Sequence, residues 1–319
     1  MTRGVNVDGV LVTWGDRLFY PGNRMVKGGP PLRLRGDALR RRAALIRGRI
    51  AATVVRRAPQ VMVKVTGGGR GMRAITAHFR YISKNGRLEI EDDRGETIRG
   101  RQAVRDLAED WRFSGSLIPD DSEGPGRREA FNIMLSMPRG VDPLAVQRAA
   151  REFARSELSG HKYVMVLHDH QANPHVHISV RAEGRNGRRL NPRKADLQRW
   201  RETFAEKLRE LGVEAEATRR TVRGQQRQYE NLWRLKAREA GRLRKEARPA
   251  PGGASAKPRS PEILEAWQRI AQALDASAAP GDGRLAQAVS GFIRRELASQ
   301  HREVEARPVD ALLDRGIRR

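Results

Sequence analysis

The chain has 319 residues, of which 38% are hydrophobic, and it carries a formal net charge of +25. No apolar run approaches the ~18 residues of a membrane span, and the N terminus lacks a signal-peptide pattern, so we expect a cytoplasmic protein without membrane insertion. The absence of cysteine excludes disulfides and thiolate ligands, so a metal site would need His, Asp or Glu side chains. The large positive charge indicates a polyanionic partner, and nucleic acid is the leading candidate.

The positive charge is concentrated in two parts of the chain. Residues 1–60 hold 13 basic and 3 acidic side chains, and residues 181–250 hold 21 and 10. Residues 61–180 are nearly balanced, with 18 basic and 16 acidic side chains, as are residues 251–319, with 11 and 9. A nearly neutral block between basic flanks is expected if the block carries the chemistry and the flanks bind phosphates.

The first 59 residues contain an Arg-rich helical stretch and no sustained strand pattern, so we interpret 1–59 as a basic arm, partly disordered. A mixed pattern of strands and helices follows. Apolar periodicity and turn residues predict a strand at Gln60–Thr66, a helix at Met72–Lys84 stopped by Asn85-Gly86, a short strand and turn at 87–95, a helix at 101–112, a strand at Ala130–Met137, a helix at Pro143–Leu158, and strands at Lys162–His168 and His175–Arg181.

Only six residues connect the last two strands, which predicts an antiparallel hairpin. The fold class is therefore α+β, an antiparallel β-sheet with packed helices. Beyond the sheet, the sequence predicts helices at 193–211, 225–247, 262–276 and 284–299, with a Pro- and Gly-rich linker at 249–261.

Five of the seven histidines fall within 17 residues, and the core of this cluster reads HDHQANPHVHISV. Because alternate side chains in a strand share a face, His175 and His177 project together. The short turn returns the end of the preceding strand, His168, beside them. Three imidazoles can thus converge on one cation.

We therefore predict a divalent metal site formed by the three histidines. Mg or Mn is the expected ion, and Zn, Co or Ni is also compatible with imidazole ligands. Three neutral ligands leave positions open for phosphate oxygens, so the cation could act as a Lewis acid. Asp169 and His170, at the start of the turn, could support the ligands, accept a proton or replace a ligand.

The chain has only four tyrosines, at positions 20, 81, 163 and 229. In the predicted helix GMRAITAHFRYISK, Tyr81 lies roughly 140° from the centre of the apolar stripe, so it projects from the open face near His78 and Lys84. Tyr81 is therefore a candidate nucleophile, although the helix pattern by itself favours an ordinary surface or interface tyrosine. Tyr163 lies in the strand that leads to His168 and is a candidate core residue.

The triple glycine at 67–69 follows the first predicted strand. GGGRGM lacks the Lys-Ser/Thr ending of a nucleotide phosphate loop, so a flexible turn or a contact with a DNA backbone is the better interpretation.

Two segments resemble motifs of plasmid relaxases of the HUH endonuclease superfamily. HDHQANPHVHISV resembles the third motif of the MOB-P class, HxDxxNxHxHxxV, and departs from it at His170, where the class commonly has Asp. AHFRYISKNGRLEIE resembles the first motif of relaxases related to the T-DNA border endonuclease, in which the residue matching Tyr81 is the nicking nucleophile. The resemblance covers about 60–215 and includes NIMLSMPRGVD at 132–142.

The resemblance implies a DNA relaxase that nicks one strand at an origin of transfer. Tyr81 would form a 5′-phosphotyrosine link while metal held by His168, His175 and His177 polarises the phosphate. The implied partners are single-stranded or hairpin DNA at the origin, accessory transfer-initiation proteins, and a coupling protein of a secretion channel. With a relaxase nuclease domain at 60–215 from this resemblance, composition and periodicity divide the rest of the chain into a basic arm at 1–59, a basic helical extension at 216–248, a linker at 249–261 and a C-terminal helical segment at 262–319.

Two alternatives remain open at the level of the sequence. Replication initiators and single-strand transposases share the paired histidines and the tyrosine, but their tyrosine usually follows the histidines, whereas here it precedes them. A non-enzymatic DNA-binding protein with a structural metal is the second alternative.

Overall fold

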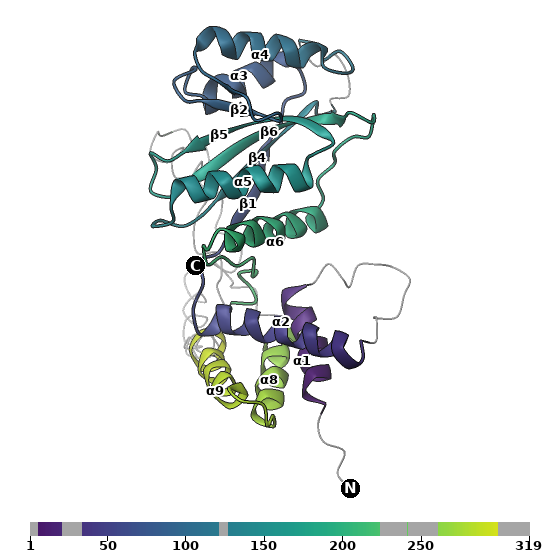
Figure 1. Ribbon diagram of the computed structural model, residues 1–319, viewed down its shortest axis with the longest axis vertical. Helices are drawn as coiled ribbons and strands as arrows, with labels where there is room; N and C mark the ends of the chain where they lie inside the picture. The colour runs from purple at the N-terminus through teal and green to yellow at the C-terminus, as the bar shows by residue number, and fades with distance from the viewer. Residues whose placement is uncertain (1–5, 21–33, 121–126, 224–240, 242–260, 299–319) are drawn as a thin grey trace, which may run out of the picture. The chain divides into compact units, whose positions relative to one another are not determined.

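The computed structural model describes residues 6–20, 34–120, 127–223, 241 and 261–298 (Figure 1). The chain forms two compact units, one of residues 58–217 and one that joins residues 1–57 to 218–319. Within the described ranges, no helix combines the length and the apolar character needed to cross a membrane. Apart from Gly241 and Pro261, the helix expected at 225–247 and the linker expected at 249–261 lie outside the described residues.

The unit of residues 58–217 is built on a six-stranded sheet with the strand order β1-β4-β6-β5-β2-β3. Every pairing in the sheet is antiparallel. The strands are β1 (Met62–Gly67), β2 (Ile90–Asp92), β3 (Thr97–Ile98), β4 (Ala130–Ser136), β5 (His161–His168) and β6 (His175–Gly184). The hairpin predicted from the six-residue connection is the β5–β6 pair at the centre of the sheet.

Two pairs of helices cover the two faces of this sheet (Figure 1). Helices α3 (Met72–Ile82) and α4 (Arg101–Phe113) lie on one face. Helices α5 (Pro143–Glu157) and α6 (Lys194–Glu210) lie on the other, where they pack on the larger apolar core. The expected α+β fold, an antiparallel sheet with packed helices, is confirmed.

Strand alternation separates polar from apolar side chains on β6. The side chains of Val176, Ile178 and Val180 are fully buried in the core beneath α5 and α6. Since side chains alternate between the faces of a strand, His175 and His177 project from the opposite face, the one that α3 and α4 cover. The sheet therefore presents its imidazoles toward helix α3.

Helix α3 follows its sequence pattern closely. Its buried residues are the four of the apolar stripe: Met72, Ile75, Phe79 and Ile82. The helix stops because Lys84, Asn85 and Gly86 adopt positive φ angles of 50°, 58° and 80°, which a right-handed helix cannot accommodate. The end of α3 is thus held at a defined place above the sheet.

The second unit is helical within its described residues. It contains α1 (Val7–Phe19), α2 (Gly36–Val54), α8 (Pro261–Asp275) and α9 (Asp282–Phe292), followed by the π-helical turn η2 (Ile293–Ala298). Phe19 and Trp267 meet edge to face with ring centroids 5.9 Å apart, and both belong to one apolar core with Phe292. An ion pair of 2.9 Å joins Arg47 to Asp282.

This packing differs from the separate basic arm expected at 1–59. Helices α1 and α2 form a core with helices more than half the chain away, so the N-terminal residues 7–19 and 36–54 are part of a folded unit. Sequence reasoning missed α1, although seven of its 13 residues, VDGVLVTWGDRLF, are apolar and the helix packs against α2 and α8. The rest of the arm, at 1–5 and 21–33, lies outside the described residues.

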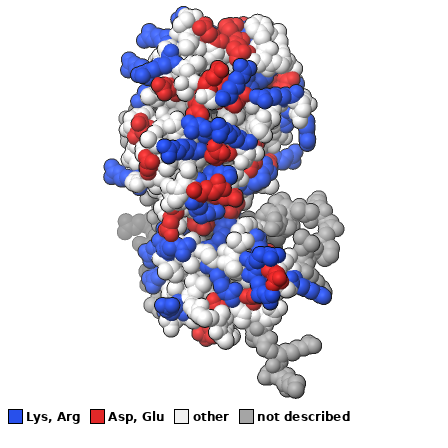
Figure 2. All heavy atoms as spheres, viewed as in Figure 1, with Lys and Arg blue, Asp and Glu red and all other residues white. Residues whose placement is uncertain are grey.

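Charged side chains of both signs are interspersed on the face of the molecule drawn in Figure 2. Several arginines of the unit 58–217 are engaged by acidic neighbours, including Arg189 with Glu129 at 3.0 Å and Arg199 with Glu157 at 2.9 Å. These pairs neutralise part of the basic charge of the unit locally.

Candidate metal and nucleophile site

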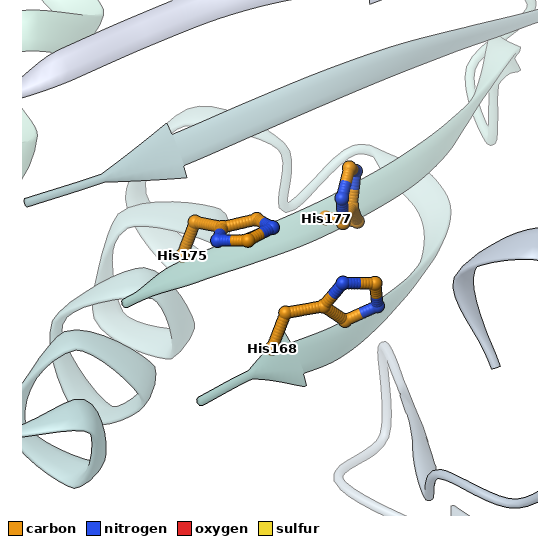
Figure 3. A group of neighbouring side chains, drawn as sticks. All are labelled: His168, His175 and His177. Atoms are coloured by element: carbon orange, nitrogen blue, oxygen red, sulfur yellow. The ribbon is translucent and has the colours of Figure 1, made fainter. Parts of the chain in front are cut away.

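The predicted histidine triad is brought together by the register of the β5–β6 hairpin. His168 lies directly opposite His175, and Val166 lies opposite His177. The three rings have centroid separations of 4.7 to 5.1 Å, and one ring nitrogen of each lies within 4.8 Å of the others. All three side chains are buried, and they gather at one end of the two strands (Figure 3).

Two of the three rings are fixed by hydrogen bonds to backbone carbonyls. Nε2–H of His168 donates to the carbonyl of Ile82 at 2.7 Å, and Nδ1–H of His175 donates to the carbonyl of Asn173 at 2.9 Å. These bonds leave Nδ1 of His168 and Nε2 of His175 with free lone pairs. Ile82 is the last residue of α3, so the bond from His168 also satisfies a carbonyl at the helix end.

The surroundings favour the neutral form of two of the three imidazoles, His168 and His177. Burial, followed by the neighbouring His168, His175 and His78, lowers the pKa of His177 to about 3. Burial also lowers the pKa of His168, and the nearby imidazoles and Lys84 contribute to the shift. Neutral imidazole is the form that binds a metal ion.

The residues therefore fit a divalent cation. Three ring-nitrogen donors from two paired strands converge, and two rings already have their other nitrogen bonded to a carbonyl, as metal-binding histidines usually do. Small rotations of the rings would bring the donors to the spacing of one ion. Within the described ranges, this is the one group of three such side chains close enough to hold an ion.

Tyr81 lies next to this triad. Its side chain is 69% exposed, and its ring centroid is 6.3 Å from that of His177, with the two planes at 80°. Since the following residue, Ile82, accepts the hydrogen bond from His168, the turn of α3 that carries Tyr81 is tied to the triad. The expected position of Tyr81, off the apolar stripe and on the open face, agrees with this geometry.

Tyr163 points to the other side of the sheet. It is only 4% exposed and belongs to the core beneath α5 and α6, with Met165 as a neighbour on β5. By contrast, Val164 and Val166 pack on the α3 side, the side on which His168 lies. A hydroxyl on Tyr163 is therefore separated from the triad by the sheet itself.

The two other candidate residues of the turn are less closely held. His170 is exposed, and its ring centroid lies 5.1 Å from that of His168. Asp169 is exposed as well, and no hydrogen bond or ion pair joins its carboxylate to the described residues. The structure thus brings His170 to the edge of the triad and leaves Asp169 facing solvent.

Sequence reasoning placed His78 near Tyr81 without giving it a role. The ring of His78 lies 6.2 Å from Tyr81 and 6.3 Å from His177, between centroids. The spacing of three residues from Tyr81 on one helix face was the available signal. Its proximity to His177 depends on how α3 packs on the sheet.

Together these features define a class of site: three buried histidines that could hold a metal ion, beside an exposed tyrosine, on an antiparallel sheet. Residues 81–213 match the family model described as "Relaxase: MobA/VirD2-like, nuclease domain". This segment begins at Tyr81 and contains the triad, so the part of the chain that holds the candidate site is the part that is similar to the MobA/VirD2-like relaxase nuclease domain. The resemblance noted in the sequence is confirmed, and it implies DNA endonuclease and strand-transferase activity.

The comparisons with solved structures and with curated proteins give less information about the chain than the family model does. A solved structure described as "Molecular Basis of Vancomycin Resistance Transfer in Staphylococcus aureus" shares 16% sequence identity, with 51% of this chain and 99% of that chain covered and a TM-score of 0.32. At that TM-score the likeness defines neither the fold nor the function. No curated protein matches the chain at a significant level.

Proposed function

We propose that the chain is a mobilisation relaxase that nicks one DNA strand at an origin of transfer and becomes covalently linked to the cut end through Tyr81. The observation that carries the proposal is the exposed phenol of Tyr81 beside the buried triad, 6.3 Å from His177 between ring centroids. The relaxase nuclease match over the same residues supports it.

The metal ligands and the nucleophile of the proposed reaction are side chains of this chain. His168, His175 and His177 would hold a divalent cation, for which Mg or Mn is our first expectation and Zn, Co or Ni the alternatives. When bound, the cation supplies Lewis acidity to an oxygen of the scissile phosphate. Tyr81 Oη attacks phosphorus, an O–P bond forms, and the bond to the 3′ oxygen breaks, which leaves a 5′-phosphotyrosine and a free 3′-hydroxyl.

Proton transfer needs an acceptor for the phenol hydrogen and a donor for the departing 3′ oxygen. His170 is the candidate for these transfers because it is exposed and its ring lies 5.1 Å from His168. Asp169, in the same turn, is the second candidate. Because the phosphotyrosine link conserves the bond energy, a later 3′-hydroxyl can attack it and rejoin the strand.

Substrate binding rests on basic side chains. Lys84 lies close enough to His168 for its charge to affect the imidazole, so it can also contact a phosphate that enters the site. The basic flanks supply further attraction for single-stranded or hairpin DNA. In the cell, the proposed setting is the cytoplasm, with accessory transfer-initiation proteins and a secretion-channel coupling protein as partners.

The decisive test is covalent trapping. The wild-type chain, incubated with Mn²⁺ and a single-stranded oligonucleotide that carries the nick site, should yield a protein–DNA adduct on a denaturing gel. Tyr81→Phe should form no adduct, although its stability should change by less than about 0.5 kcal/mol because the side chain is exposed. Tyr163→Phe is the matched control and should retain adduct formation.

The same assay separates the alternatives. An adduct that persists in Tyr81→Phe and maps to another tyrosine would refute the proposed nucleophile. A chain that binds the oligonucleotide and never forms an adduct would instead be the non-enzymatic DNA-binding protein. A cut at a replication origin, and none at an origin of transfer, would indicate a replication initiator.

A further inference from the structure

The histidine triad is asymmetric in the partners of its outward ring nitrogens. A metal-bound histidine usually donates its second ring N–H to a carbonyl, a carboxylate or a water, which fixes the ring. His168 and His175 have such partners in the carbonyls of Ile82 and Asn173. The third ring, His177, has no backbone partner of this kind in the described part of the chain.

The unpaired atom of His177 is Nδ1, which is fully buried. The ring of His78 lies close by, with its centroid 6.3 Å from that of His177 and the planes at 75°. Nε2 of His78 is likewise buried and makes no hydrogen bond to the described residues. Two buried polar nitrogens without partners, on neighbouring rings, are costly because each has lost its hydrogen bond to water.

The two imidazoles have complementary chemistry. If Nε2 of His177 binds the cation, Nδ1 carries the hydrogen and needs an acceptor. A neutral His78 whose hydrogen is on Nδ1 offers the lone pair of Nε2.

We infer that His78 is a positioning residue for the metal centre: its Nε2 accepts the hydrogen bond from Nδ1–H of His177. The present separation needs a small rotation of His78 or one bridging water to complete the bond. The inference rests on the proposed function only in that the triad must bind a cation. Its consequence is that α3 supplies both the nucleophile and the support of one metal ligand.

Metal affinity tests this role without DNA. His78→Leu keeps a bulky side chain but removes the acceptor, whereas His78→Gln restores an acceptor through its amide oxygen. Thr76→Ala is the matched control, since position 76 lies about 200° around α3 from His78. Dissociation constants for Mn²⁺ and Co²⁺ would be measured by calorimetry, the Co²⁺ absorption spectrum would report ligand geometry, and circular dichroism would report folding.

We expect His78→Leu to bind both ions about 10- to 100-fold more weakly, with an altered Co²⁺ spectrum. His78→Gln should recover most of the affinity, and Thr76→Ala should match the wild type. A folded His78→Leu variant with wild-type affinity and spectrum would overturn the inference, and so would a His78→Gln variant as weak as His78→Leu.

The tautomers of the wild-type protein provide a test that needs no variant. Long-range ¹H–¹⁵N spectra of the Zn²⁺-loaded chain should show the hydrogen of His177 on Nδ1 and that of His78 on Nδ1. A hydrogen on Nε2 of His78 would refute the role, because that nitrogen could not accept. Normal metal binding without any DNA adduct would contradict the proposed relaxase function but not the role of His78. The two proposals can therefore be refuted independently.

Discussion

At the scale of single residues, the site depends on imidazoles that burial keeps neutral. His177 and His78 have folded-state pKa values of about 3 and about 4, against an ordinary value of 6.5. Below pH 6.5 the unfolded chain binds protons that the folded chain does not, so protonation favours unfolding. The stability that these residues contribute is therefore complete above pH 6.5 and is lost progressively as the pH falls toward 4 and 3.

This loss of stability at low pH gives a prediction for the metal-free protein. In the presence of a chelator, the melting temperature should fall between pH 7 and pH 5, and the fall should be smaller in His177→Gln, which has no group to protonate there. Differential scanning calorimetry of both proteins at the two pH values measures the difference. Equal falls in the two proteins would contradict the assigned pKa shift.

At the scale of elements, the triple glycine at 67–69, which begins at the last residue of β1, has a structural explanation. A Cβ atom on Gly68 would lie 2.2 Å from the carbonyl oxygen of Ala130 on β4, far inside contact distance. The carbonyl of Gly69 also accepts backbone hydrogen bonds from Glu129 and Ala130, at 2.8 and 3.1 Å. The chain therefore passes too close to β4 at Gly68 for a side chain to fit there.

We accordingly predict that Gly68→Ala destabilises the protein by about 1–3 kcal/mol, because backbone atoms must move to accept the new methyl group. Gly160→Ala is the control: its Cβ would meet nothing within 4 Å, so its effect should stay within about 0.5 kcal/mol. Urea denaturation measures both. Similar stabilities for the two variants would show that the approach of Gly68 to the Ala130 carbonyl does not exclude a side chain. That result would favour the alternative interpretation of residues 67–69 as a contact with a DNA backbone.

At the scale of the whole molecule, the division into two units separates the site from much of the basic charge. Residues 58–217 contain the sheet, the triad and Tyr81, whereas α1 and α2 of the basic N-terminal region belong to the other unit. Deletion of 1–59 would remove α1 and α2 from the core that they share with Trp267. A fragment cut at the unit boundaries is the cleaner experiment.

We predict that the fragment 58–217 folds and binds Mn²⁺ like the full chain but binds single-stranded DNA more weakly. The dependence of its affinity on salt should also be shallower, because fewer lysines and arginines displace counterions from the DNA. Circular dichroism, calorimetry and a salt titration of oligonucleotide binding check the three statements. An unchanged salt slope would mean that the phosphate contacts lie within residues 58–217.

Local patterns predicted most of the unit 58–217. The apolar stripe of α3 and the alternation of the strands arise from side chains a few residues apart, so the sequence determines them directly. The same reasoning identified the triad, because two strands joined by only six residues form an antiparallel hairpin, in which His168 lies beside His175. It also placed Tyr81 on the open face of its helix.

Contacts between distant segments were decided only by the tertiary structure. The proximity of the His177 and His78 rings, the bond from His168 to the end of α3, and the burial of Tyr163 on the far face all depend on which side of the sheet each helix packs. The same holds for α1 and α2, whose apolar residues pack on each other and on helices near the other end of the chain. Periodicity specifies which face of an element is apolar. Which other element packs on that face depends on the total free energy of burying the apolar faces of all elements together, which no local pattern contains.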